Sequence, residues 1–139
     1  MDKLHLEIVT PQGQIFNDDV SSVVLPGSEG EFGVLPNHAS LISLLKAGII
    51  DIEDKNKKHD VVAINWGYAK IDEGKVVILA DGAVYVSGDS ESELANSLEA
   101  ARKLIESMSS DTNAFAATIS KMENVVRARS VSYTHLRAH

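Results

Sequence analysis

The residues best suited to chemistry in this chain are its histidines and paired carboxylates, and their spacing argues against a metal or catalytic centre. The histidines are His5, His38, His59, His135 and His139. None has a second histidine or a cysteine at the spacing of a zinc site, and the chain has no cysteine. The acidic segments Asp18–Asp19 and Asp51–Asp54 are expected to be solvated turn charges, because paired acid–base catalysis needs two carboxylates in unlike environments.

A second candidate for chemistry is the segment Gly27–Ala39, in which glycines stand at positions 27, 30 and 33. A phosphate-binding P-loop would need Gly-Lys-Ser/Thr leading into a helix. Here Glu29 and Glu31 would repel phosphate, and the next lysine is Lys46. Because glycine permits positive φ and close backbone approach, the spacing predicts a specialised loop rather than a strand or a helix.

The segment Gly88–Ser90 contains part of the nucleophile motif of hydrolases, Gly-x-Ser-x-Gly. No glycine follows Ser90, however, and Glu93 stands three residues later, which is typical of a helix capping box. With no strong nucleophile, metal set or cofactor motif, an enzyme is the weaker class of function.

The elements that would position these residues divide the chain into two parts with different hydrophobic periods. Up to about residue 88, apolar stretches separated by polar turns predict strands at 4–9, 20–25, 48–52, 61–64, 68–71 and 76–79. No long helix interrupts this series, which indicates an antiparallel β-sandwich or barrel. Trp66 and Tyr68 would anchor a core or an interface in such a sheet, and core packing is favoured for Trp66.

After Gly88 the apolar residues follow a helical period. One predicted helical face consists of Leu94, Leu98, Ala101, Ile105 and Met108. The polar run 109–113 ends this helix, and a second helical face follows over 115–126. Two helices joined by a short turn predict an antiparallel hairpin over 89–129, so the expected fold class is α+β. The hairpin could dock on the sandwich or bind a partner, and residues 130–139 are interpreted as a frayed or foreign tail.

The composition limits the classes of partner. The chain has 139 residues, 44% of them hydrophobic, which suits one compact domain with a small appendage. Its net charge of -7 argues against nucleic-acid binding and gives no polybasic attraction to anionic lipid. No apolar run is long enough to span a bilayer, and the N-terminus has no signal or transit pattern. We therefore expect a cytoplasmic protein that associates with membranes only through a partner.

The segment Gly27–Pro36 followed by His38–Ala39 closely resembles the signature of the epsilon subunit of F-type ATP synthases. The segment Leu79–Val84 and the order of a sandwich followed by a hairpin extend this resemblance over residues 4–129. The resemblance implies a non-catalytic subunit of the rotating central stalk. Its sandwich, residues 1–88, would bind the gamma subunit and the c-ring and would couple c-ring rotation to the gamma shaft.

The resemblance also implies roles for individual residues. The c-ring contact would include Glu29, Glu31, Phe32 and His38. The hairpin would permit turnover when folded on the sandwich, and would block ATP hydrolysis when extended into the alpha/beta catalytic head. The candidates for that inhibitory contact are the basic residues of the second helix, Lys121, Arg127 and Arg129.

Some bacterial members of the family bind ATP as a regulatory ligand through an Ile/Leu-Asp-x-x-Arg-Ala motif on the first helix. This chain matches at Leu98 and Arg102, but it has Glu99 in place of the aspartate and Lys103 in place of the alanine. The extra methylene of Glu99 displaces the carboxylate by about a bond length, which weakens a tight contact. We therefore expect at most a weak ATP site, and no other cofactor is implied.

The expected location is the cytoplasmic face of a bacterial inner membrane, as a peripheral part of the synthase. The pattern alone leaves two other functions open, a small-molecule or peptide-binding sandwich with a helical lid and a jelly-roll enzyme. Purification with a gamma-like partner would favour the stalk subunit, whereas bound metal would favour the enzyme.

Overall fold

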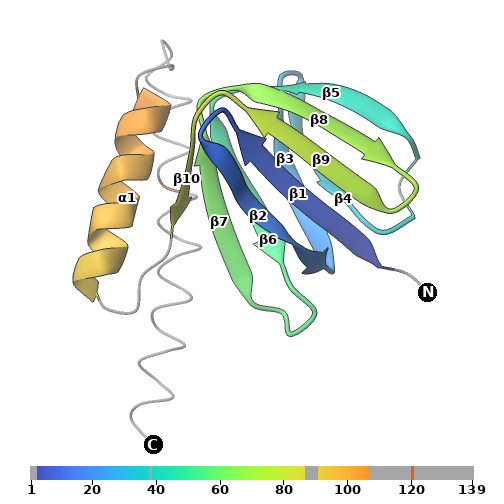
Figure 1. Ribbon diagram of the computed structural model, residues 1–139, viewed down its shortest axis with the longest axis horizontal. Helices are drawn as coiled ribbons and strands as arrows, with labels where there is room; N and C mark the ends of the chain where they lie inside the picture. The colour runs from blue at the N-terminus through green and yellow to red at the C-terminus, as the bar shows by residue number, and fades with distance from the viewer. Residues whose placement is uncertain (1–2, 38, 87–90, 107–119, 121–139) are drawn as a thin grey trace, which may run out of the picture.

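The computed structural model describes residues 3–37, 39–86, 91–106 and 120, which form a β-sandwich with a helix beside it (Figure 1). The elements defined in these ranges are β1 (Leu4–Thr10), β2 (Gly13–Val20), β3 (Ser22–Gly27), β4 (Gly30–Val34), β5 (Leu41–Leu45), β6 (Gly48–Glu53), β7 (His59–Ile64), β8 (Gly67–Asp72), β9 (Lys75–Ala80), β10 (Ala83–Val86) and α1 (Glu91–Glu106).

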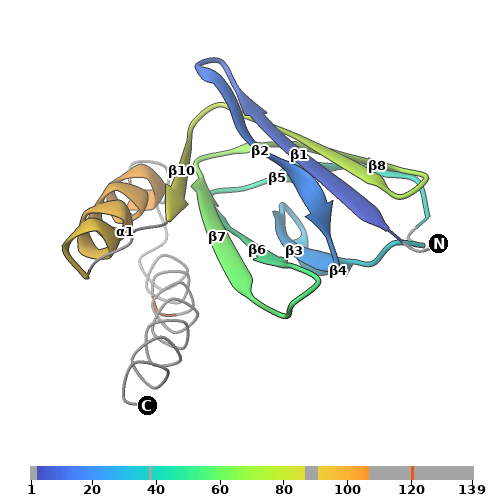
Figure 2. The same cartoon turned by 60° about the horizontal axis from the view of Figure 1, so that its bottom comes forward.

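The strands follow one hydrogen-bonded path in the order β10-β7-β6-β3-β5-β8-β9-β1-β2, and β4 pairs with β3. This path folds into two layers, with β1, β2, β5 and β8 in one and β3, β4, β6 and β7 in the other (Figure 2). Neighbouring strands are antiparallel except β1 and β9, which are parallel. The predicted antiparallel sandwich followed by a helical region is thus confirmed, with one parallel pair inside it.

The two ends of this path meet through aromatic side chains. Phe16 on β2 stacks on Tyr85 of β10, with ring centroids 6.3 Å apart and an interplanar angle of 27°. Both rings are half-buried and pack against the core. Side-chain packing therefore joins the two strands that lie furthest apart in the hydrogen-bonded order.

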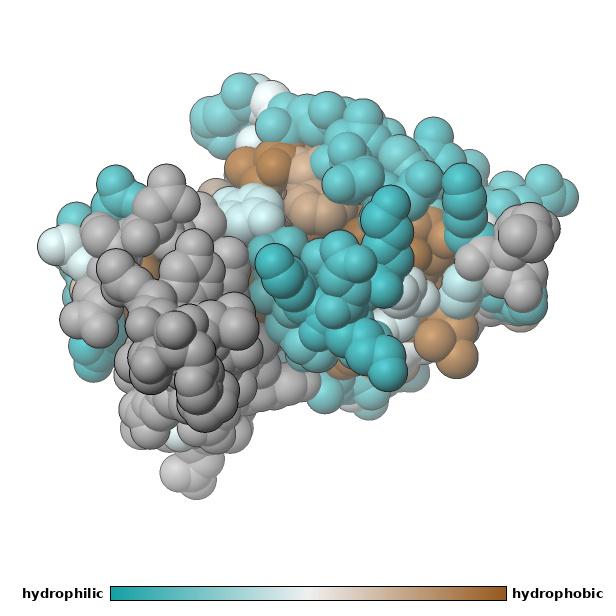
Figure 3. Space-filling model, turned by 90° about the horizontal axis from the view of Figure 1, so that it is seen from below, coloured by the Kyte–Doolittle hydropathy of each residue, from teal (hydrophilic) through white to brown (hydrophobic). Residues whose placement is uncertain are grey.

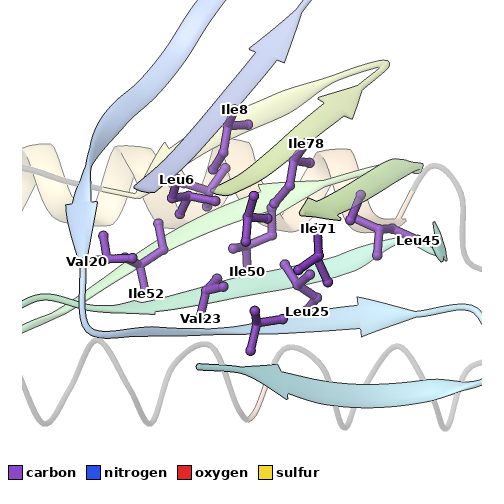
Figure 4. Close-up of a cluster of buried hydrophobic side chains, with 14 of the residues drawn as sticks. Leu6, Ile8, Val20, Val23, Leu25, Leu45, Ile50, Ile52, Ile71 and Ile78 are labelled. Atoms are coloured by element: carbon purple, nitrogen blue, oxygen red, sulfur yellow. The ribbon is translucent and has the colours of Figure 1, made fainter. Parts of the chain in front are cut away.

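Aliphatic side chains from both layers fill the core between them. β1 shows the pattern, because Leu4, Leu6 and Ile8 are fully buried while the residues between them are partly exposed. This alternation follows from the two-residue repeat of a strand with one face on the core. Labelled side chains of this cluster, which come from seven strands, converge in Figure 4: Leu6, Ile8, Val20, Val23, Leu25, Leu45, Ile50, Ile52, Ile71 and Ile78.

A second, smaller apolar cluster attaches α1 to the outside of the sandwich. Ala101 and Ile105 of the helix are buried against Ala63 and Val86 of β7 and β10, and Leu94 is half-buried beside them. The predicted first helix and its apolar face are confirmed over Leu94 to Ile105. Met108, the cap at Ser90, the second helix and the segment 130–139 lie outside the described residues.

Two sequence-based expectations are wrong. Gly27–Ala39 is not a loop throughout, because Gly30–Val34 forms β4 and pairs with β3. The acidic pairs are not turn charges, because Asp18 and Asp19 lie on β2 while Asp51 and Glu53 lie on β6, where the latter two are only partly exposed. In both cases pairing with a neighbouring strand satisfies the backbone, which local composition does not reveal.

Candidate functional site

The glycine-rich segment forms a tight β3–β4 hairpin whose turn projects from the sandwich. Gly27 pairs with Gly30, so that Ser28 and Glu29 make the turn. A Cβ at Gly27 would lie 2.6 Å from the carbonyl oxygen of Gly30 and 2.9 Å from the ring of Phe32. Gly30 itself has a φ of 135°, which residues with a side chain rarely adopt. Two of the three glycines are therefore required by this conformation.

The hairpin brings most of the predicted c-ring residues to one edge. Glu29 and Glu31 are exposed, whereas Phe32 is half-buried and packs against the core beside Gly27. His38 lies outside the described residues. Two carboxylates thus project from a hairpin that is held in place by an aromatic ring.

Strand β5 braces this hairpin from the side. The amide of Ser28 donates a hydrogen bond to the carbonyl of Leu44 at 2.9 Å, and the amide of Lys46 donates to the carbonyl of Pro26 at 2.9 Å. These bonds fix the turn relative to β5.

The same strand contributes to an exposed apolar surface. Five large apolar side chains are each between 41% and 71% exposed: Ile42, Leu44, Trp66, Tyr68 and Leu79. We call these five residues the apolar patch. They come from β5, from β8 with the residue just before it, and from β9, which are hydrogen-bonded neighbours.

The strand register shows that the apolar patch is contiguous. Leu44 lies directly opposite Tyr68, and Tyr68 lies directly opposite Leu79. The ring of Trp66 meets that of Tyr68 edge-on, with centroids 6.1 Å apart and an interplanar angle of 74°. The expectation that Trp66 packs in the core is wrong, because its side chain is 41% exposed and belongs to this surface.

Sequence reasoning missed the apolar patch because its signal is faint. In β8, Gly67, Ala69 and Ile71 are buried while the residues between them are exposed, so Tyr68 points outward. Alternation predicts this direction only when the inward register is known. The available sign of the apolar patch was Tyr68, an aromatic residue at an outward-facing position of β8.

A different surface lies around the β6–β7 turn, which projects downward in Figure 1. Seen from below, hydrophilic residues dominate the coloured part of this side, and hydrophobic ones form separate spots (Figure 3). Within the described residues, no group of three or more histidine, cysteine, aspartate or glutamate side chains is placed to hold a metal ion.

Two histidines with altered acid–base properties also escaped the sequence analysis. His59 contacts Asp51 through Nδ1 at 2.8 Å and Glu53 through Nε2 at 3.4 Å. The hydrogen bond with Asp51 raises the pKa of His59. His5 contacts Asp19 through Nδ1 at 2.9 Å, and this bond likewise raises the pKa of His5.

Of the three residues of the expected ATP motif, two lie close together and the third faces the sandwich. Glu99 and Arg102 are both exposed on α1, with Glu99 Oε2 3.9 Å from Arg102 Nη1. Leu98 instead turns toward the sandwich, where it packs on the second cluster. The expected inhibitory residues Lys121, Arg127 and Arg129 lie outside the described residues.

The sequence model of one protein family, the beta-sandwich domain of the ATP synthase delta/epsilon chain, matches residues 3–86 of this chain. The chain belongs to this family. The ATP synthase epsilon chain of Campylobacter concisus is 98% identical over 93% of this chain and its own full length. Those of Campylobacter curvus and Campylobacter fetus are 92% and 60% identical, with the same coverage.

Solved ATP synthase structures contain the same fold. One is a chain in the mitochondrial ATP synthase of Euglena gracilis, solved with OSCP, F1 and the c-ring, which matches with a TM-score of 0.60 and 27% identity. The match covers 91% of this chain and 76% of the Euglena chain. A chain in the Tetrahymena thermophila central stalk and c-ring has a TM-score of 0.51 and 15% identity, covering 76% of this chain and 95% of its own, and shows likeness of fold.

Family membership places the chain in ATP synthase as its epsilon subunit, an accessory part of the complex with no catalytic role of its own. Among the described residues, no helix is long and apolar enough to cross a membrane.

Proposed function

We propose that this epsilon chain joins the central stalk of the rotary motor and regulates it. Its sandwich, residues 1–88, binds the gamma subunit and rests on the c-ring, so that c-ring rotation is coupled to the gamma shaft. Its helical part, residues 89–129, restrains ATP hydrolysis by reaching the alpha/beta head. The location is the cytoplasmic face of the bacterial inner membrane, where the chain is held by its partners.

The observation that carries this proposal is the apolar patch. Contiguous exposed apolar area on a soluble domain marks a surface that a partner covers, and tryptophan and tyrosine dominate the binding energy of such surfaces. Trp66 and Tyr68 stand together here, flanked by Leu44 and Leu79. We assign this surface to the gamma subunit, because a joint that carries torque needs a broad and rigid contact.

The c-ring contact belongs to the β3–β4 hairpin in this proposal. Glu29 and Glu31 are exposed on a turn whose shape requires glycine, and Ser28 ties that turn to β5. Carboxylates in such a place would form charge-assisted hydrogen bonds with basic residues of the c-ring loops. Phe32 acts in the contact by supporting the turn, and His38 follows it in the sequence.

The regulatory role is supported by how α1 docks. In the described part of its apolar face, Ala101 and Ile105 are buried, while Leu94 and Leu98 are half-buried. Full burial of an aliphatic side chain contributes about 1.5–3 kcal/mol, so this contact is weak enough to be exchanged for another. Lys121, Arg127 and Arg129 would then meet acidic residues of the head, and ATP would bind no more than weakly near Leu98, Glu99 and Arg102.

The interface is tested by placing a charge in the apolar patch. Tyr68→Asp should abolish rebinding of the full-length chain to ATP synthase from which the native subunit has been stripped, because burying an unpaired carboxylate is costly. Asn56→Asp, a matched change in the exposed β6–β7 turn, should rebind normally. Normal rebinding of Tyr68→Asp would assign the gamma contact to another surface.

The regulatory role is tested by comparing the full-length chain with a version that ends at Gly88. Both should rebind, and only the full-length chain should suppress ATP hydrolysis. Because the truncation uncovers Val61 and Val86, circular dichroism must first show that the sandwich remains folded. Equal suppression by both versions would locate the inhibitory element in the sandwich.

A further inference from the structure

One basic residue stands inside the apolar surface, and its surroundings indicate the chemistry of the partner. Lys70 is exposed on β8, two residues after Tyr68 and on the same outward face. It lies opposite Ile42 of β5 on one side and opposite Val77 of β9 on the other. Its ammonium group therefore rises from apolar neighbours on both flanking strands.

The nearby carboxylates already accept hydrogen bonds from this chain. Glu7, beside Val77, accepts from the amide of Gln14 at 2.7 Å. Asp72 accepts from the hydroxyl of Ser40 at 2.7 Å. Neither of them forms an ion pair with Lys70, for which no salt bridge occurs in the part of the chain that the structure describes.

A further acidic residue at the border of the apolar patch is also engaged. Asp81 accepts from the amide of Asn65 at 3.0 Å, next to Trp66. Lys46, which directly follows β5, is exposed and likewise has no ion pair among the described residues. The carboxylates at this surface are thus engaged by neutral donors of this chain, whereas Lys70 and Lys46 have no ion pair among the described residues.

Covering the apolar patch would remove the ammonium of Lys70 from water. An ammonium group that loses its hydration without gaining a partner opposes binding, whereas a carboxylate placed opposite it restores the lost interaction and fixes the register of the interface. We propose that the protein surface covering the apolar patch carries an aspartate or glutamate opposite Lys70, surrounded by apolar residues. This inference rests on the proposed function, because it requires that the apolar patch be a subunit interface.

The first test measures rebinding of full-length variants to ATP synthase stripped of the native subunit. Lys70→Glu should weaken binding about a hundredfold or more, because it places a carboxylate opposite the carboxylate of the partner, and the two repel each other. Lys70→Met keeps the apolar stem and should weaken binding about tenfold, with a smaller loss of affinity on adding salt than the wild-type chain shows. Lys55→Glu, a reversal in the β6–β7 turn, should bind as the wild-type chain does.

The second test identifies the opposing group. A carbodiimide, which joins an amine to a carboxylate in direct contact, should link Lys70 of the reassembled complex to an aspartate or glutamate of another subunit, as read by peptide mass spectrometry. Cross-links from Lys70 should disappear in Lys70→Met while those from other lysines persist.

The outcomes separate this inference from the proposed function. If Tyr68→Asp abolishes binding but both Lys70 variants bind as tightly as wild type, the interface stands and the opposing carboxylate does not exist. Tighter binding of Lys70→Met would lead to the same conclusion, because the ammonium group of Lys70 would then oppose binding. If Tyr68→Asp, Lys70→Glu and wild type all bind equally, the apolar patch is not the interface, so the gamma contact lies on another surface and the inference about Lys70 fails.

Discussion

The side chain of His59 lies between two carboxylates of the neighbouring strand, so its charge affects the stability of the β6–β7 hairpin. Asp51 and Glu53 approach its two ring nitrogens, and Asp54 adds a further negative charge nearby. Since both ring nitrogens face acceptors, only the imidazolium form donates to both.

His59 should therefore make stability depend on pH. The raised pKa of folded His59 means that its contribution is fully present below the unfolded value of 6.5 and is lost as pH rises through the folded value. Compared with His59→Gln, the wild-type chain should be more stable at pH 5.5 by about 0.2–1 kcal/mol, because the group is partly exposed. This advantage should vanish by about pH 8.5. Urea unfolding across this range measures it, and a constant difference would contradict the assignment.

The glycines of the β3–β4 hairpin should differ sharply in their tolerance of a side chain. Gly27→Ala should lower the free energy of unfolding by about 1–3 kcal/mol, because the new Cβ meets the Gly30 carbonyl and the Phe32 ring. Gly33→Ala is the matched control, since nothing lies within 4 Å of its added Cβ. Denaturant unfolding of both variants should show the difference. Equal effects would mean that the turn rearranges.

At the scale of elements, α1 and the sandwich are held together by a contact that is separate from the main core. Ile49, Val61 and Ala63 face outward from β6 and β7 and form the floor on which the helix lies. An element held by so small a cluster opens at a lower free energy than the strands beneath it.

Ile105→Ala should therefore loosen α1 without unfolding the sandwich. Removing this buried side chain costs about 2–5 kcal/mol at the helix contact. Hydrogen exchange should accelerate in Glu91–Glu106 and remain slow in the buried strands. Lys103→Ala, on the exposed side of the same turn, should leave exchange in α1 unchanged. Uniform acceleration through both parts would show that helix and sandwich unfold as one unit.

At the scale of the whole molecule, the sandwich is closed by contacts between residues far apart in the sequence. Strands β1 and β9 come from opposite ends of the domain and pair in parallel. Beyond them, Phe16 and Tyr85 join β2 to β10. Pairings of this kind assemble slowly, because the chain must close long loops before it gains the contacts.

A double-mutant cycle with Phe16→Leu and Tyr85→Leu measures this closure. The two changes should be coupled by about 0.5–1.5 kcal/mol, the range measured for aromatic pairs beyond their buried area. A pairing of Phe16→Leu with Tyr68→Leu, a ring outside this contact, should be additive. Equilibrium unfolding of the single and double variants provides the values. Zero coupling for the first pair would mean that the rings contribute only through burial.

Much of the fold was predictable because its signals are local. The alternation of Leu4, Leu6 and Ile8 predicts β1, and the change to a helical period predicts α1. The β3–β4 glycines, with Glu29 and Glu31 between them, form one local motif. What escaped prediction was β2, whose exposed Asn17–Asp19 segment lacks an apolar pattern, together with β4, β5 and β10.

By itself, the sequence determined the fold class, the family and the position of the glycine-rich turn, because each depends on residue types at fixed local spacing. The tertiary structure decided which side of β5, β8 and β9 faces water. It thereby placed Trp66 and Tyr68 on the surface, set Lys70 between apolar neighbours and brought His59 to Asp51. Those outcomes depend on strand register, and register is settled only when residues distant in the sequence compete for one core.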